Sequence, residues 1–560
     1  MQQRDPGTGK RMALAIVISL GLIIGFNLLT NKNKPQEQSA PPITEEKSTP
    51  ATTSPQLAAP VTAPVTKVPE PAKVSLSASG SPEEVYNLEN AKILLSFTNK
   101  GAALKQIQMK QFFYEGGKYI DISAQSDTYP LYLQVENANL GADYKLLERS
   151  ANSLTFLQES KDLAVEKKFI LGADAYDLTL QIKVTNKGNA NWTSRSMLRW
   201  GTSMGPFLEE KKRTRYDEEI MVSYFDVNEN SEEKVEEQTI TKRVKIDWVG
   251  MDNRYFFAAI MPEKTDTYDI YLKNEKTLYD QEIGILQDIS LASQASAAQN
   301  YTIYIGPKDE RLLKEYNRNL EAISERGFSL IVLIGKGIKW LLFQINSVAG
   351  NFAISIILMT LLLKILLNPL TNKSMESAKK MQTLQPQITA LKAKYANADP
   401  KEMNAKIWEL YRREKVNPAS GCLPMLLQMP FFFALYNVLP YIVELKDTNF
   451  LWITDLSSPD TVAYVNLLLT NNLNILPLLL TVFSFIQTKV SQGGHANTGQ
   501  GKMMEGLMPI IFLFIFWNMP SGLVLYWLMQ TVFTILHQLY KNHRPSKKKS
   551  SKKKIANKSV

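Results

Sequence analysis

The chain has 560 residues, of which 44% are hydrophobic and 21% charged, and carries a net charge of +10. This length allows two or three units, at roughly 100–200 residues per domain. Residues 80–325 hold 30 Lys and Arg against 39 Asp and Glu, a net of −9, which leaves +19 for the rest. The basic remainder also contains long apolar runs, which favours a membrane surface over DNA as its partner. The single cysteine, Cys422, excludes an internal disulfide.

The N-terminal part predicts an anchor and a linker. Residues 12–31 are uncharged and follow Arg4, Lys10 and Arg11, and about 20 apolar residues are enough to span a bilayer. No Ala-x-Ala site follows, so an uncleaved transmembrane anchor is favoured over a cleaved signal peptide. Residues 1–11 precede the anchor, and residues 32–78 are rich in Pro, Ala, Thr and Ser, which is typical of a disordered linker.

Residues 79–325 are predicted to form an antiparallel β-sandwich domain. The clearest strand alternates apolar and polar residues, the pattern of a half-buried strand, with Leu178, Leu180, Ile182 and Val184 as its apolar members. Residues 93–97, 131–135 and 301–305 show the same character, and turn signals separate the strands. Residues 309–325 look helical and close the domain.

Residues 326–346 are predicted to form an amphipathic helix along the membrane surface. The segment is apolar, but Lys336 and Lys339 share one face of it. Gly335 and Gly337 weaken it as a spanning helix, which favours an interfacial position.

Five further crossings are predicted in a core over residues 347–541. Each lies in an uncharged run, and Asn471, Asn472 and Asn474 restrict the third run to its later part. The runs are residues 340–363, ending near Asn368 and Pro369; 416–443; 461–488; and 506–540, which holds two spans separated by a turn at 518–522.

Loop charges predict the orientation. Residues 373–415 hold ten Lys and Arg, and the basic tail from Lys541 holds nine, whereas residues 444–460 contain only Lys446. The positive-inside rule then places six spans with both termini, including the tail 542–560, in the cytoplasm and the β-domain in the periplasm. Residues 372–415 read as a cytoplasmic helical hairpin with a break near Asn397 and a helix start at Asp399-Pro400. The hairpin is either a docking arm or a solvated spacer.

Lys364 is the only charge within the body of the last five spans. An ionisable residue at that depth is a functional-site hypothesis by default. A lysine one turn from Asn368-Pro369 can also extend its ammonium to the lipid head groups, and physics alone leaves both interpretations open. Thr360 lies on the same helix face, and polar residues in the other spans suggest a wet groove: Gln428, Asn437, Ser484, Gln487, Asn518, Ser521 and Gln530.

Six motifs in these spans resemble the YidC insertases of Gram-negative bacteria, which are related to the mitochondrial Oxa and chloroplast Alb insertases. In chain order they are KILLNPLT (364–371), MQTLQP (381–386), EKVNP (414–418), GCLP (421–424), QMP (428–430) and PSGLVLY (520–526). Their order and their places along the spans make the resemblance specific. It covers residues 349–540 most closely, and the anchor, linker and β-domain match the longer bacterial architecture.

The resemblance implies a membrane protein insertase and chaperone of the inner membrane, with a groove open to the cytoplasm. The groove cation attracts acidic stretches of nascent membrane proteins, and apolar segments leave along the third and fifth spans. The substrate groove would comprise Lys364, Thr360, Gln428, Tyr526, Trp527, Ser521 and Gln487. Two positions depart from the family, which usually has Arg at Lys364 and Tyr at Trp527.

The same resemblance implies partners. They are the lipid bilayer, the Sec translocon (SecYEG and SecDF) and, through the hairpin and the basic tail, the ribosome. Basic residues of the hairpin are the candidates for cytoplasmic docking: Lys379, Lys380, Lys392, Arg412 and Arg413.

Neither a catalytic nor a metal site is predicted, and no cofactor is expected. The three histidines, His495, His537 and His543, and the single cysteine have no metal-ligand spacing. Two other functions stay open. A secondary transporter would need repeated spans with a broken helix at mid-membrane, and an anchored periplasmic protein that binds sugar or peptide would not need five more spans.

Overall fold

The structure is a computed structural model. It describes residues 82–113, 117–123, 129–136, 138, 143–201, 203–205, 217, 220–236, 238–275, 280–324, 329–395, 399–414, 416, 423–446, 448–464, 472–492 and 499–543. The predicted anchor at 12–31, the linker at 32–78 and the tail from 544 onward lie outside the described residues. So do Asn397, Asn471, Cys422 and His495.

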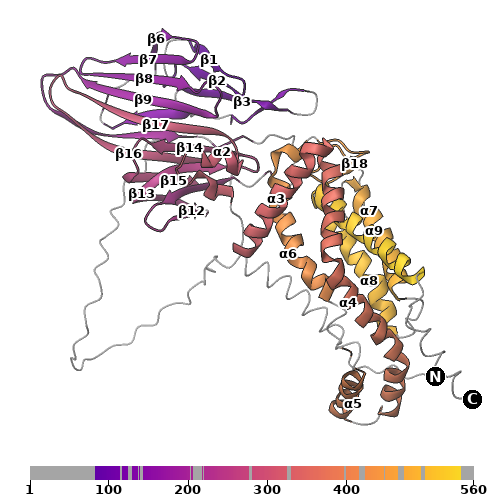
Figure 1. Cartoon of the computed structure of the whole chain (residues 1–560). Helices are drawn as coiled ribbons and strands as arrows, with labels where there is room; N and C mark the ends of the chain where they lie inside the picture. Colours follow the sequence, from indigo (N-terminus) through magenta and orange to yellow (C-terminus); the bar gives the residue numbers. More distant parts are fainter. Residues whose placement is uncertain are drawn as a thin grey trace, which may run out of the picture. The chain divides into compact units, whose positions relative to one another are not determined.

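The first part of the described chain is an antiparallel β-domain (Figure 1). Its strands are β1 (Val85–Glu89), β2 (Ile93–Thr98), β3 (Ala103–Phe113), β4 (Tyr119–Asp121), β5 (Pro130–Val135), β6 (Lys145–Arg149), β7 (Ser153–Glu159), β8 (Leu163–Leu171), β9 (Asp177–Asn186), β10 (Trp192–Trp200), β11 (Met221–Asp226), β12 (Ser231–Val235), β13 (Gln238–Asp252), β14 (Phe256–Pro262), β15 (Asp266–Asn274), β16 (Gln281–Leu291) and β17 (Ser296–Pro307).

Two sheets share one apolar core. The smaller has the strand order β1-β2-β3-β4, and the larger runs β5-β10-β16-β15-β13-β14-β17-β9-β8-β7-β6, with β11 on β13 and β12 on β11. The predicted alternation holds in β9, where Leu178 and Ile182 are buried and Gln181 and Lys183 are exposed. The β-rich domain is thus confirmed.

The helix predicted over residues 309–325 is wrong as a single element. The structure has a short helix α2 (Glu310–Lys314) and a 3-10 turn η3 (Leu320–Ser324). Asn317 and Asn319 lie between them with φ of 51° and 56°. This left-handed backbone conformation cannot continue a right-handed helix, so the helix ends.

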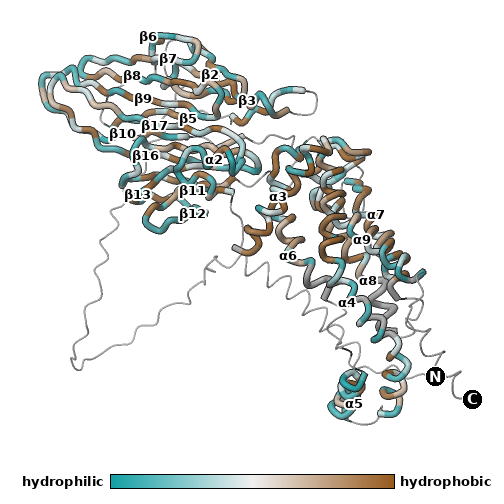
Figure 2. Tube along the Cα trace, viewed as in Figure 1, coloured by the Kyte–Doolittle hydropathy of each residue, from teal (hydrophilic) through white to brown (hydrophobic). Residues whose placement is uncertain are grey.

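The second part of the chain is helical (Figure 1). Its helices are α3 (Ser329–Ala349), α4 (Phe352–Lys394), α5 (Pro400–Arg413), α6 (Leu423–Val438), α7 (Ile475–Gln492), α8 (Gly499–Phe516) and α9 (Ser521–His543). The 3-10 turns η5 (Leu439–Tyr441) and η6 (Val443–Leu445) follow α6, and the short strands β18 (Thr461–Ala463) and β19 (Leu473–Asn474) precede α7. Figure 2 shows the first half of α4 as mostly hydrophobic and α5 as mostly hydrophilic.

Among the described residues, three helical stretches are long and apolar enough to cross a membrane: 330–349, 352–369 and 521–541. Residues 475–490 and 507–516 form shorter apolar helices. The first stretch belongs to α3, and its sequence predicts a helix along the membrane surface rather than a span. The count of six spans is therefore not established by helix length.

The structure divides the uncharged run 340–363 at Gly350. The φ of +65° at Gly350 ends α3, and Asn351 then caps α4 by accepting from the backbone N–H groups of Ala353 and Ile354. The predicted end of the span near Pro369 agrees with the apolar stretch 352–369, although the helix α4 itself continues for 43 residues with Pro369 and Pro386 inside it. A proline removes one backbone hydrogen bond, and a long helix can absorb that loss as a kink.

Other boundaries agree with the prediction. Asp399 caps α5, and its carboxylate accepts from the N–H of Lys401 at 2.9 Å, with Pro400 in the first turn. The end of α4 packs on α5 through a small apolar cluster that includes Leu384, Ile388 and Leu410. Helix α7 begins directly after Asn474, and residues 517–520 separate α8 from α9.

Candidate functional site

Lys364 lies on the inward face of α4. Its side chain is only 8% exposed, and Ile356, Thr360 and Leu363, at helical spacing from it, are also buried. The opposite face of the helix carries exposed apolar residues: Leu361, Leu362, Ile365 and Leu366. The spacing of the apolar residues therefore turns the lysine towards the helix bundle rather than towards lipid.

A neutral hydroxyl holds the ammonium group of Lys364. Its Nζ donates to Oγ1 of Thr534 on α9 at 2.6 Å, and that hydroxyl donates to the backbone carbonyl of Gln530 at 2.6 Å. Within the described part of the chain, no carboxylate forms an ion pair with Lys364. The positive charge is thus buried between two helices with no acidic partner among the described side chains.

Two amides and a phenol continue this polar row. Nε2 of Gln530 donates to Oε1 of Gln428 on α6 at 3.0 Å, and Nε2 of Gln428 lies 3.4 Å from the hydroxyl of Tyr526. Tyr526, Gln530 and Thr534 recur every four residues, so they share one face of α9. We call Lys364, Thr534, Gln530, Gln428 and Tyr526 the polar ladder. It joins α4, α6 and α9 in an otherwise apolar core.

The other predicted groove residues have different contacts. Thr360 is fully buried and donates to the carbonyl of Ile356 in its own helix. Ser521 donates to the carbonyl of Asp455 in the loop between η6 and β18. Trp527 packs at 5.2 to 5.9 Å between ring centroids against the rings of Phe432, Phe512 and Phe516. Gln487 is half-buried on α7.

Thr534 is the residue that sequence reasoning missed. A single threonine in an apolar helix is common, because its hydroxyl can bond to its own backbone. The available signal was its spacing: Tyr526, Gln530 and Thr534 form a polar stripe along α9.

The predicted docking residues lie on the helical hairpin. Lys380 and Lys392 are exposed on the second half of α4, and Arg412 and Arg413 are exposed at the end of α5. The side chain of Lys379 lies outside the described residues. Helices α4 and α5 pack on each other through apolar residues, including Leu384, Ile388 and Leu410.

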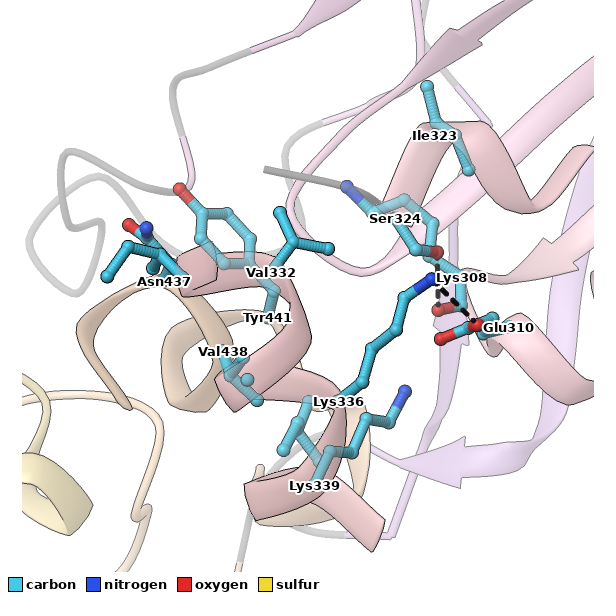
Figure 3. Close-up of a pocket in the computed structure, with 13 residues that line it drawn as sticks. Lys308, Glu310, Ile323, Ser324, Val332, Lys336, Lys339, Asn437, Val438 and Tyr441 are labelled. Atoms are coloured by element: carbon cyan, nitrogen blue, oxygen red, sulfur yellow. Dashed lines mark hydrogen bonds and ion pairs between the residues drawn. The ribbon is translucent and has the colours of Figure 1, made fainter. Parts of the chain in front are cut away.

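Figure 3 shows a pocket where α3 faces the end of the β-domain. Lys308, Lys336 and Lys339 line it together with Glu310 and Tyr441. Lys308 binds Asp252 at 2.6 Å, and Lys336 reaches Glu310 at 3.3 Å. Because two of its three lysines already have carboxylate partners, we interpret the pocket as a gap between packed elements rather than as an anion-binding site.

The described residues contain no group of three His, Cys, Asp or Glu side chains that could hold a metal ion. His537 and His543 both lie on α9 in its last two turns. The candidate site is therefore the polar ladder, which can attract and hydrogen-bond an acidic or polar group.

Two family models match consecutive parts of the chain. The model described as the YidC periplasmic domain matches residues 86–341, and the model described as 60Kd inner membrane protein matches residues 344–549. The first corresponds to the β-domain with the start of α3, and the second to the helical part.

Curated relatives match along most of the chain. The membrane protein insertase YidC of Pelobacter propionicus is 31% identical over 95% of this chain and 99% of its own length. The protein of the same name from Geobacter sulfurreducens is 31% identical over 80% of this chain and 84% of its own length.

Two solved structures resemble parts of the chain. A crystal structure of an active YidC insertase, with its first transmembrane domain resolved, covers 82% of this chain and 93% of its own, at 18% identity and a TM-score of 0.37. A putative aldose 1-epimerase from Escherichia coli covers 40% of this chain and 100% of its own, at 11% identity and a TM-score of 0.27.

Proposed function

The chain belongs to the YidC family of membrane protein insertases, and on that premise we propose that it inserts and folds integral membrane proteins in the inner membrane. Its substrates are nascent membrane proteins, which fits relatives that carry the name of an insertase and not of an enzyme. The proposed activity makes and breaks no covalent bond and requires no cofactor.

The observation that carries this proposal is the buried ammonium of Lys364. Transfer of a charge into a membrane costs a few kcal/mol or more, so an unpaired cation there calls for a use. An ammonium has three N–H donors, and the described neighbours accept one of them, through Thr534. A carboxylate of an incoming chain would supply the missing negative charge, and Gln428 and Gln530 would bind polar groups beside it.

Exposed apolar side chains provide the exit for the spanning segment of a substrate. On the apolar helix α8, the side chains of Ile510 and Phe514 are 44% and 60% exposed, so no other part of the described protein covers them completely. A substrate helix that packs against such residues exchanges lipid contacts for protein contacts at little cost, which permits release sideways.

We further propose the topology that loop charges predict: six spans, both termini in the cytoplasm, a periplasmic β-domain and a cytoplasmic hairpin. In chain order, the proposed units are a cytoplasmic N-terminus (1–11), a transmembrane anchor (12–31), a linker (32–78), the β-domain (79–325), the interfacial helix (326–346), the five-span core (347–541) and a basic cytoplasmic tail (542–560). The ion pair of Lys336 with Glu310 of α2 supports the surface position of α3, because it draws the charged face of that helix towards the β-domain. The interfacial helix then ends at Ala349.

The partners are also proposals. The exposed cations Lys380, Lys392, Arg412 and Arg413, together with the basic tail, would dock an anionic surface such as ribosomal RNA. Cooperation with the Sec translocon rests on the family alone.

The first prediction tests Lys364 in liposomes that contain the purified protein and a small single-span substrate with an acidic translocated tail. Lys364→Arg should keep insertion because the charge stays. Lys364→Glu should block it, because two like charges repel, and Lys364→Ala should lower the rate by about tenfold, the effect of about 1.4 kcal/mol. Insertion is measured as protection of the tail from added protease.

A matched substrate supplies the control. The same span with its acidic residues changed to Asn and Gln should depend much less on position 364. Full activity of Lys364→Ala on the acidic substrate would instead mean that the lysine only reaches for the lipid head groups.

A further inference from the structure

A buried arginine of the β-domain contacts the loops of the helical part. Arg254 lies in the turn between β13 and β14, where Oδ1 of Asn253 accepts from the N–H groups of Tyr255 and Phe256 at 3.0 and 2.9 Å. The side chain of Arg254 is completely buried. A charge in that position must be matched by several partners, because burial without them is costly.

Each of the three nitrogen atoms of the guanidinium group has such a partner. Its Nε donates to the carbonyl of Pro440 at 2.8 Å, its Nη2 donates to the carbonyl of Ser457, and its Nη1 binds Asp217 at 2.8 Å. The hydroxyl of the next residue, Tyr255, lies 2.7 Å from Oγ of Ser457. Asp217 of the β-domain neutralises the charge of Arg254. The Nε and Nη2 donors of Arg254 bind backbone carbonyls of the helical part, one in η5 and one in the loop before β18.

The same loop, before β18, also forms hydrogen bonds with the first turn of α9. The backbone N–H of Ser521 donates to the carbonyl of Ser458, and that of Gly522 donates to the carbonyl of Leu456, both at 2.8 Å. A helix leaves its first N–H groups without partners inside the helix, and here residues 455–458 supply them. The approach is close, since a Cβ at Gly522 would lie 3.0 Å from the carbonyl oxygen of Leu456.

These contacts form a continuous chain to the candidate site. Helix α9, which the loop holds at its first turn, carries Tyr526, Gln530 and Thr534 of the polar ladder. A helix is stiff over this length, so a displacement of its first turn moves the ladder residues one to three turns later.

We propose that Arg254 and Tyr255 are positioning residues for insertion: the β-domain holds residues 455–458 and thereby sets where α9 presents the polar ladder. This inference rests on the proposed insertase function. It assigns the turn between β13 and β14 a role in the geometry of the polar ladder.

The test compares two double variants of the full-length protein in liposomes. Arg254→Met with Asp217→Asn removes both charges of the pair that contacts the loop. Arg199→Met with Glu282→Gln removes a similarly buried pair between β10 and β16, whose partners all lie in the β-domain. Both variants lose one buried ion pair, and only the first loses the contact with residues 440 and 457.

Two readouts are taken from each variant. Amide hydrogen exchange of residues 517–526 reports the bonds that Ser521 and Gly522 make to the loop, and tail protection reports insertion. The Arg254 pair should speed exchange there by about tenfold or more and slow insertion by about fivefold. The Arg199 pair should change both by less than about twofold.

A milder variant covers the case in which the first does not fold. Tyr255→Phe removes only the hydroxyl that reaches Ser457 and should speed the same exchange a few-fold. Equal effects of the two double variants would overturn the proposal, as would slower insertion without faster exchange at 517–526. Because exchange is measured without substrate, failure of the wild-type protein to insert would reject the proposed function and leave the positioning contact to be judged on exchange alone.

Discussion

At the residue scale, the proposed groove cation, Lys364, is a lysine where the resemblance leads one to expect arginine. Lysine carries a compact charge on a flexible stem, whereas arginine presents a planar fork of five donors. The bond from Lys364 to Thr534 directs that flexible stem along α9. A neutral acceptor leaves the charge available, which a carboxylate in the same place would not.

A second buried lysine, Lys167, lies in the β-domain and has no part in the groove. It is fully buried on β8, and its Nζ donates to the carbonyls of Gly101, Ala102 and Leu131 at 3.0, 2.6 and 2.6 Å. All three acceptor residues have positive φ, of 72°, 42° and 66°. The ammonium thus stabilises the turn between β2 and β3 and the start of β5, where Ala102 and Leu131 adopt a backbone conformation that is rare for these residues.

Lys167 predicts a pH dependence of β-domain stability. Burial lowers the pKa of Lys167 to about 7 from the ordinary value of 10.5, so between these two values the unfolded chain binds more protons than the folded chain. The free energy of unfolding should therefore rise as pH is raised from about 7 towards 10, by up to about 1.4 kcal/mol per pH unit. Thermal unfolding of the full chain in detergent, followed by tryptophan fluorescence, measures this.

Lys167→Met serves as the reference, since it removes only this titration. The difference in stability between wild type and variant should change with pH above 7 and stay constant below. A difference that is independent of pH from 6 to 10 would show that the three carbonyls hold the proton against the cost of burial.

Residue-level prediction from the sequence works where the signal is local and unusual. Lys364 stands out as the one charge in a long apolar region, and its role stays a prediction. Two other predicted residues, Gln428 and Tyr526, lie within 3.4 Å of each other through their polar atoms. Arg254 gave no such signal, because its partners Pro440 and Ser457 are 186 and 203 residues away. Long-range pairs of this kind depend on tertiary packing, which residue spacing does not encode.

At the element scale, boundaries were predicted where a local signal marks them. Asp399 and Asn474 mark the starts of their helices correctly because a side chain or a polar run acts within one turn. Pro369 marks the end of the apolar stretch 352–369 as predicted, and α4 continues past it because a proline removes only one backbone hydrogen bond. Gly350 was overlooked, although it supplies the positive φ that separates α3 from α4.

The lengths of α8 and α9 predict a thinned bilayer beside them. The described apolar part of α8 is residues 507–516, about 15 Å long at about 1.5 Å per residue, against a hydrocarbon core of about 30 Å. Residues 521–541 of α9 reach about 32 Å by the same measure. We therefore place the expected mismatch at the apolar part of α8 rather than at α9. A thinner membrane would lower the cost of passing a polar tail.

A test follows from this difference in length between α8 and α9. Four Leu and Ala residues added to α8 before Trp517 should slow insertion of an acidic tail in the liposome assay, because the longer helix relieves the mismatch. The same four residues added to α9 after Leu536 are the control, since α9 is already long enough. Normal insertion by the α8 variant would remove thinning from the mechanism.

At the scale of the whole molecule, contacts within the protein limit which segments can lie on opposite sides of a membrane. The loop after α6 contacts the β-domain through Arg254, so the two must lie on the same side. The hairpin lies at the C-terminal end of α4, whereas the loop after α6 contacts Asn351 at its N-terminal end. Helix α4 has 43 residues and is roughly 64 Å long at about 1.5 Å per residue. A helix of that length crosses the hydrocarbon core and extends well beyond it.

The last prediction is that residues 444–460 face the periplasm and residues 372–415 the cytoplasm. It is tested with one exposed cysteine at a time in a Cys422→Ser background: Asn449→Cys in the loop after α6 and Ala405→Cys on α5, both exposed in the structure. A maleimide that cannot cross membranes should label Asn449→Cys on intact spheroplasts and Ala405→Cys only after lysis, because ten cations in the hairpin oppose its translocation. Both variants must retain insertion to count as native. Labelling of Ala405→Cys from outside would end the six-span arrangement, and since the β-domain contacts the loop, it would also move that domain out of the periplasm.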